Sequence, residues 1–189
     1  MPRPPILPVL DWPAIFASGL TFEEWLEAAE HDMNRKAMQR TLAEQVIEPQ
    51  VEALLGALPR PVYVVAIAED WCGDVLRHAP VLQRIAQAAP NMEVRYISRA
   101  QHPEVFIRFL TNGGEAIPKF IFLSDQWVEC GNWGPMPSAD RLLIARGKAC
   151  GDVGAARHKV STSYQADADR RIVVEELLDL INVAVCASP

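Results

Sequence analysis

The chain has 189 residues, half of them hydrophobic, so it is long enough to bury one substantial core. A net charge of −6 and the lack of any Lys/Arg run argue against a nucleic acid partner, because phosphate binding needs a basic face. No apolar stretch approaches the roughly 18 residues that span a bilayer, and residues 1–5 do not lead into a signal peptide, so we predict a cytoplasmic location and no membrane partner.

Residues 1–20 are rich in proline and predict an arm that is extended through about Asp11. Apolar residues between the prolines can dock this arm on the rest of the protein: Ile6, Leu7, Val9 and Leu10.

Residues 21–60 predict helices packed on the domain. Thr21 and Glu24 have the spacing of a capping box, in which a hydroxyl and a carboxylate three residues later satisfy free N–H groups at a helix start. Pro49 interrupts the pattern that follows and predicts a break near Glu48, because proline clashes with the preceding helical turn.

Residues 61–150 predict the core, beginning with a strand over residues 62–68 whose β-branched side chains are typical of burial on both faces. The elements expected after it are a helix over 73–89, a strand over 92–97, a short helix from Pro103, a hairpin formed by 120–123 and 127–130, and a helix from Ser138 to about Lys148.

Residues 151–189 complete the chain with a predicted long loop over 151–167 and a final amphipathic helix over 172–185. The order of elements predicts an α/β fold, with a mixed central sheet, helices on both faces, and helical extensions at the N-terminal and C-terminal ends.

The four cysteines are dispersed along the chain, and a reducing compartment would keep them as thiols: Cys72, Cys130, Cys150 and Cys186. Neither the cysteines nor the histidines have metal-ligand spacing, and no glycine-rich phosphate loop is present. We therefore expect no metal site and no organic cofactor.

Cys72 is the cysteine with the most informative position, at the turn between a buried strand and a helix. The free N–H groups and positive dipole end of that helix favour a thiolate, which is the species that attacks disulfides. The carboxylates of Glu69, Asp70 and Asp74 oppose a second anion nearby. The two effects leave open the direction of the Cys72 pKa shift.

Two segments carry a resemblance to a known family. The segment 68–73, Ala-Glu-Asp-Trp-Cys-Gly after an apolar strand, resembles the active-site turn of thioredoxins, and the segment 116–120 resembles their cis-proline loop. The resemblance covers roughly residues 62–148 and implies a thioredoxin-like fold with Cys72 as the nucleophile. It also implies a surface that aligns an extended substrate, formed by Trp71, Gly73, Ile117 and Pro118.

The sequence departs from the thioredoxin pattern at Val75, where a dithiol thioredoxin has its second cysteine. A monothiol thiol–disulfide oxidoreductase is therefore the predicted function, with protein or glutathione thiols and disulfides as partners and with glutathione, Cys130 or Cys150 as the resolving thiol. Lys119 follows the proline where thioredoxins commonly have a small hydroxyl residue, and its charge could offset the local carboxylates.

An interaction module that holds a peptide in the same groove without turnover is the alternative function. The helical extensions favour it, because flanking amphipathic helices often form a homodimer surface. An iron–sulfur cluster bridged between two chains, as in some glutaredoxins, is a third interpretation. His78, on the helix after Cys72, is expected to be exposed, and the second Cys-Gly-Asp-Val at residues 150–153 lacks a preceding strand and is attributed to chance.

Overall fold

The computed structural model describes residues 7–186, so the part of the proline-rich arm that contains Ile6 lies outside it. A four-stranded sheet with the order β2-β1-β3-β4 forms its centre. The parallel pair joins β1 to β2, and the antiparallel pairs join β1 to β3 and β3 to β4, with the bounds β1 Val62–Ile67, β2 Met92–Ile97, β3 Lys119–Leu123 and β4 Glu129–Trp133. This is the predicted mixed sheet, and the predicted hairpin is confirmed.

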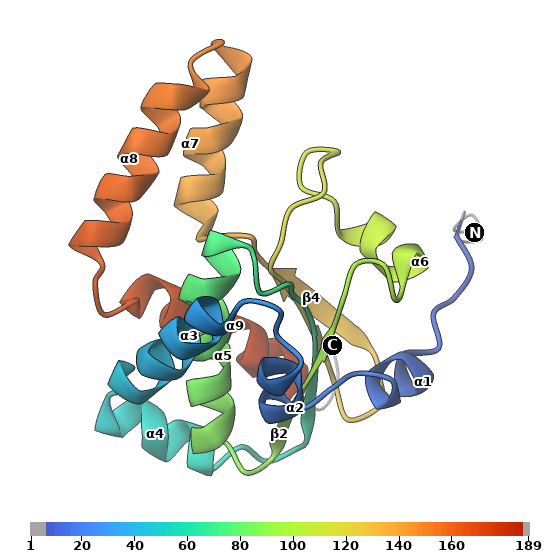
Figure 1. The fold of residues 1–189 in the computed structure, drawn as a ribbon. Coiled ribbons are helices and arrows are strands. Elements are labelled where there is room, and N and C mark those ends of the chain that lie inside the picture. The colour runs from blue at the N-terminus through green and yellow to red at the C-terminus, as the bar shows by residue number, and fades with distance from the viewer. Residues whose placement is uncertain (1–6, 187–189) are drawn as a thin grey trace.

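Helices cover both faces of the sheet (Figure 1). One face carries α3 Asp32–Glu44, α4 Pro49–Gly56, α5 Gly73–Ala88 and α9 Arg171–Ala184, and the other carries α1 Trp12–Ala17, α6 Pro103–Phe106 and the short 3-10 helix Ile107–Phe109. Within residues 7–186, no helix combines the length and the apolar character required to cross a membrane.

The N-terminal helices follow the local signals in the sequence. Helix α2 (Phe22–Glu27) begins with the predicted capping box, in which Glu24 N–H donates to Thr21 Oγ1 and Thr21 N–H donates to Glu24 Oε2, at 3.2 and 2.8 Å. The predicted break is confirmed, because α3 ends at Glu44 and α4 begins at Pro49.

The proline-rich arm predicted over residues 1–20 contains a short helix, α1, which was not predicted from the sequence. Asp11 caps this helix by accepting a hydrogen bond from Ala14 N–H (3.1 Å), and a proline in the first turn costs no backbone hydrogen bond. Trp12, Ile15 and Phe16 are buried, so α1 is held by packing as well as by its cap.

The predicted loop over residues 151–167 was wrong, since α8 (Val153–Ala166) occupies most of it. Asp152 caps α8 through Ala155 N–H (2.9 Å). Helix α8 packs on α7 (Ser138–Ala149) where Gly147 allows close approach: a Cβ on Gly147 would lie 2.4 Å from Ala156 Cβ. The resulting α7–α8 hairpin (residues 138–166) projects from the sheet in Figure 1.

One hydrophobic core joins the sheet to the helices at both ends of the chain. The final helix α9 contributes Val173, Leu177 and Ile181, which are almost fully buried. Helix α5 packs between α3 and α9 and presents its first turn, where Cys72 lies, at the end of β1. The core therefore fixes the position of the strand-to-helix turn.

Candidate thiol site

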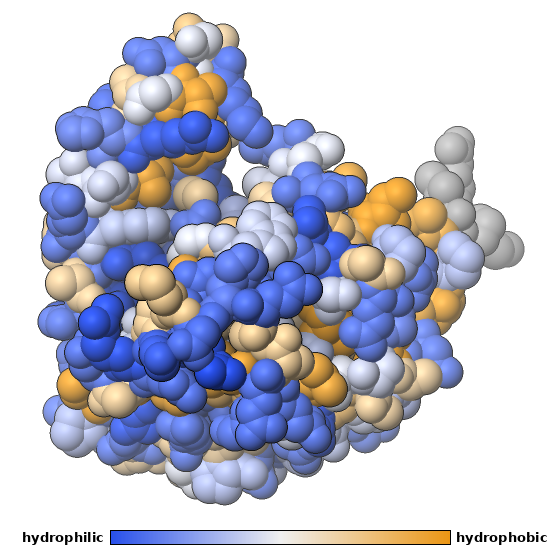
Figure 2. Space-filling model, in the orientation of Figure 1, coloured by the Kyte–Doolittle hydropathy of each residue, from blue (hydrophilic) through white to orange (hydrophobic). Residues whose placement is uncertain are grey.

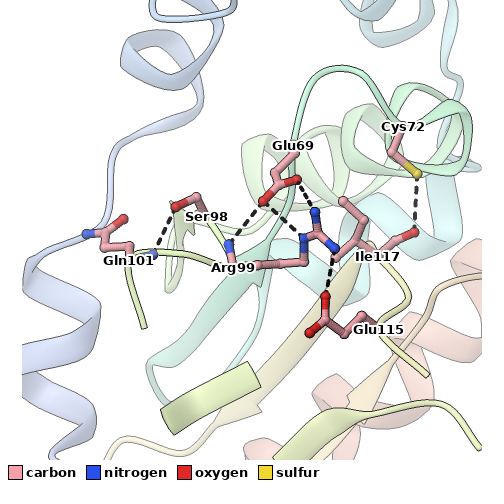
Figure 3. Close-up of polar contacts among 7 residues, drawn as sticks. All are labelled: Glu69, Cys72, Ser98, Arg99, Gln101, Glu115 and Ile117. Carbon is pink, nitrogen blue, oxygen red and sulfur yellow. Dashed lines mark hydrogen bonds and ion pairs between the residues drawn. The ribbon is translucent and has the colours of Figure 1, made fainter. Parts of the chain in front are cut away.

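Cys72 occupies the N-cap position of α5, directly after the turn that follows β1, and its side chain makes no capping hydrogen bond. Its half-buried thiol donates a hydrogen bond to the carbonyl oxygen of Ile117, 3.4 Å away, and the Ile117–Pro118 peptide bond is cis (Figure 3). The structure therefore brings together Cys72 and the Pro118 loop (residues 116–119), as the resemblance implies.

The pKa of the Cys72 thiol is raised above its ordinary value. Burial is the largest cause, and the charge of Asp74 acts in the same direction. Backbone N–H groups of Val75 and Asp74 and the positive charge of Arg99 act in the opposite direction without prevailing. Desolvation thus decides the direction of the pKa shift that the sequence left open, and it favours the neutral thiol over the thiolate.

Arg99 is a site residue that the sequence reasoning missed. Its guanidinium binds both oxygens of Glu69, at 3.1 and 3.0 Å, and also binds Glu115 at 3.1 Å (Figure 3). The same group lies 5.3 Å from the ring centroid of Trp71, within cation–π range. A signal existed: Arg99 follows β2, which is parallel to β1, and the carboxyl ends of parallel strands meet at one edge of a sheet.

Asp70 is engaged on the other side of the turn. Its Oδ2 accepts a hydrogen bond from His31 N–H (2.9 Å) and lies 3.1 Å from His31 Nδ1, while Asn34 donates to its backbone carbonyl (2.9 Å). The predicted modulators of the thiol therefore have different partners, because Glu69 is bound by Arg99 and Asp70 by the start of α3.

Asp74 belongs to a hydrogen-bonded chain that connects α5 to the α7–α8 hairpin. Tyr164 Oη donates to Asp74 Oδ1 at 2.9 Å and lies 3.3 Å from His78 Nε2. His78 is fully buried, which corrects the expectation of an exposed side chain, and burial lowers its pKa well below the ordinary value. The expectation failed because α8, which covers this face of α5, was predicted to be a loop.

The Lys119 side chain points toward the residues that directly follow β4. Its Nζ donates to the carbonyl of Gly134 at 2.7 Å, and burial followed by the nearby charge of Arg141 lowers its pKa to about 8. The positive charge that acts on Cys72 comes from Arg99.

The other cysteines lie on different elements. Cys130 is on β4, where its thiol donates to the carbonyl of Val128 (3.2 Å), and its pKa is raised by burial first and then by the nearby Cys186. Cys150 is exposed at the turn between α7 and α8. Over the described range 7–186, no group of three or more His, Cys, Asp or Glu side chains is placed to hold a metal ion.

Comparisons with known proteins agree with this geometry. The family model described as Thioredoxin matches residues 19–152. Two solved structures are similar in fold: a protein of unknown function from Pseudomonas aeruginosa (TM-score 0.64, 17% identity, 88% of this chain and 96% of that chain) and an HIV epitope-scaffold (TM-score 0.62, 18% identity, 79% of this chain and 99% of that chain). No curated protein matches. Since the family model covers more than half of the sequence, the chain belongs to the thioredoxin family.

Proposed function

We propose that the protein is an interaction module that binds an extended polypeptide segment between Trp71, Cys72 and the Pro118 loop, without dithiol turnover. The observation that carries this proposal is the state of Cys72: a half-buried thiol with a raised pKa, donating to the Ile117 carbonyl. Val75 occupies the position at which a dithiol thioredoxin has its second cysteine, and it is fully buried in the core. A neutral thiol in this position acts as a hydrogen-bond donor and a packing group.

The surface beside the thiol supports binding of a chain. Trp71 is 53% exposed, which is unusual for a tryptophan, and the Arg99 guanidinium holds its ring from one side. A neighbouring cavity of about 550 Å³ is lined by charged and apolar side chains that include Glu69, Arg99, Phe106, Ile107, Leu110 and Glu115. An exposed aromatic ring beside a partly apolar cavity is a common way to hold the side chains of a peptide.

Monothiol exchange is the second candidate, and one observation favours it. The backbone N–H groups of Asp74 and Val75 act to lower the pKa of Cys72, so they would stabilise a thiolate once it forms. That thiolate would attack a disulfide sulfur, forming a mixed disulfide and releasing one thiolate. A second thiol, such as glutathione, would then attack the mixed disulfide and restore Cys72.

The pH dependence of Cys72 alkylation separates the two candidates. We expect iodoacetamide to label Cys72 with an apparent pKa above the ordinary value of about 8.5, with mass spectrometry scoring each cysteine separately. The Asp74→Asn variant keeps the backbone N–H group and removes the negative charge, so its apparent pKa should be lower than that of the wild type. Rapid labelling at pH 7, with an apparent pKa below about 8.5, would favour monothiol exchange instead.

Selection of peptides tests binding itself. Peptides selected from a display library on the reduced protein should bind a Cys72→Ser variant within about twofold of the wild type, because serine preserves a hydrogen-bond donor. A Trp71→Ala variant should bind them about tenfold or more weakly, the loss expected when an aromatic anchor is removed. Leu54→Ala, which changes an exposed apolar residue on α4, is the matched control. The proposal would be contradicted by peptides whose affinity falls in the Cys72→Ser variant and does not change in the Trp71→Ala variant.

A further inference from the structure

A second cavity, of about 390 Å³, lies between α7, the hairpin strands and the residues that follow the 3-10 helix. Figure 2 shows the surface hollowed between the α7–α8 hairpin and the rest of the molecule. Most of the side chains that line this cavity are polar, two are cationic and none is acidic; the lining residues used in the argument are Thr111, Lys119, Asn132, Ser138 and Arg141.

The two cations converge on a single neutral acceptor. Lys119 Nζ and Arg141 Nη1 both donate to the carbonyl of Gly134, at 2.7 and 3.2 Å. Lys119 is only 3% exposed, and neither residue forms an ion pair within the part of the chain that the structure describes. A buried cation without an anionic partner is costly, and the partly buried Arg141 lies on the same carbonyl, so this arrangement is suited to receive an anion.

The nearby carboxylates already have hydrogen-bond partners other than Lys119 and Arg141. Glu176 accepts hydrogen bonds from Trp133 Nε1 (2.6 Å) and from the N–H of Ser138 (2.9 Å), and Asp140 accepts one from Ser163 (3.4 Å). The hydroxyl of Thr111, which lines the same cavity, is buried and has no hydrogen-bond partner among the described residues. The cavity thus offers unused donors as well as two positive charges.

We infer that this cavity binds a carboxylate carried by the polypeptide that occupies the Pro118 loop. The inference rests on the proposed function: Lys119 directly follows Pro118, and Leu110 lines both this cavity and the cavity beside Arg99, so the two cavities adjoin along the path of a bound chain. The planar guanidinium of Arg141 matches a carboxylate in a two-point contact, with Lys119 adding a point charge. An aspartate or glutamate side chain and a free C-terminus present the same chemistry.

The site itself is tested first with acetate as the probe. NMR of the Lys119 side-chain Cε–Hε signals should show a saturable shift on addition of sodium acetate, beyond that caused by sodium chloride at equal ionic strength. Arg141→Gln should weaken acetate binding about tenfold, while Lys36→Gln, which changes an exposed lysine paired with Asp32, should not. An acetate response equal to the chloride response, or unchanged in Arg141→Gln, would overturn the site.

The source of the carboxylate is tested with the display-selected peptides, synthesised with Asp or Asn, with Glu or Gln, and with a free or amidated C-terminus. We expect that removing one carboxylate from a peptide weakens its binding to the wild-type protein about tenfold. The same change should leave binding to the Arg141→Gln variant unaltered. Peptides that bind without this preference would overturn the inference and leave the proposed function standing. Acetate binding without any peptide binding would overturn both the proposed function and the polypeptide source.

Discussion

Replacement of Val75 by cysteine is expected to produce an internal disulfide with Cys72 and to give the protein dithiol activity. Val75 is the third residue of α5 and lies three positions after Cys72, the spacing at which side chains on successive turns share one face of a helix. The smaller side chain removes buried volume at a cost of about 0.5–1.5 kcal/mol, which a folded domain tolerates. Insulin reduction by dithiothreitol should be accelerated roughly tenfold or more relative to wild type.

Mass spectrometry after equilibration with reduced and oxidised glutathione detects the disulfide directly, as the loss of two hydrogen atoms. The Cys72→Ser/Val75→Cys double variant is the control, because it retains the new cysteine and lacks its partner. A Val75→Cys variant that forms only mixed disulfides with glutathione would show that the two sulfur atoms are too far apart for a bond.

Replacement of Gly134 by alanine is expected to lower the free energy of unfolding by about 2–6 kcal/mol, the sum of backbone strain and overpacking. Gly134 has φ +114°, and a Cβ there would lie 2.1 Å from the backbone oxygen of Pro118. Relief of that clash must move the Pro118 loop away from the residues around Gly134, because the atom that the new Cβ would meet belongs to the backbone. The Pro118 loop would then separate from Cys72, and the thiol should alkylate faster.

Urea denaturation measures the stability change. Gly151→Ala is the matched control: Gly151 also has positive φ, +74°, but its added Cβ would meet nothing within 4 Å. Only the conformational cost, about 1–2 kcal/mol, is expected there, with no change in Cys72 labelling. An equal loss of unfolding free energy in the two glycine variants would show that the contact with Pro118 contributes nothing to the stability change.

The sequence predicts the sheet and its covering helices well because each has a strong local signal. The β-branched run of β1, the capping box at Thr21 and the proline at the start of α4 all act over a few residues. Helix α8 has only the Asp152 cap as a local signal, since it buries only Ala156 and Val160 and depends on close packing against Gly147. Its stability is tertiary, and periodicity alone does not reveal it.

The same contrast between local signals and tertiary packing applies to the candidate site. The meeting of Cys72 with the Pro118 loop is what the resemblance of two segments to thioredoxins implies, since in that family the cis-proline loop lies against the reactive cysteine. Arg99 and Tyr164 were missed because each reaches the site from a segment remote in the chain. The direction of the thiol pKa shift depends on burial, which is a property of the assembled fold and of no short motif.

The continuous core described above has a consequence for shortened versions of the protein. Leu177 and Ile181 of α9 share one cluster with Phe120 of β3 and with Phe16 of α1. Glu176 of α9 adds a polar tie, since it binds Trp133 of β4 and the first residue of α7. The helices at the two ends are therefore parts of a single cooperative folding unit, and trimming either one as an appendage would strip apolar cover from the strands that position the thiol.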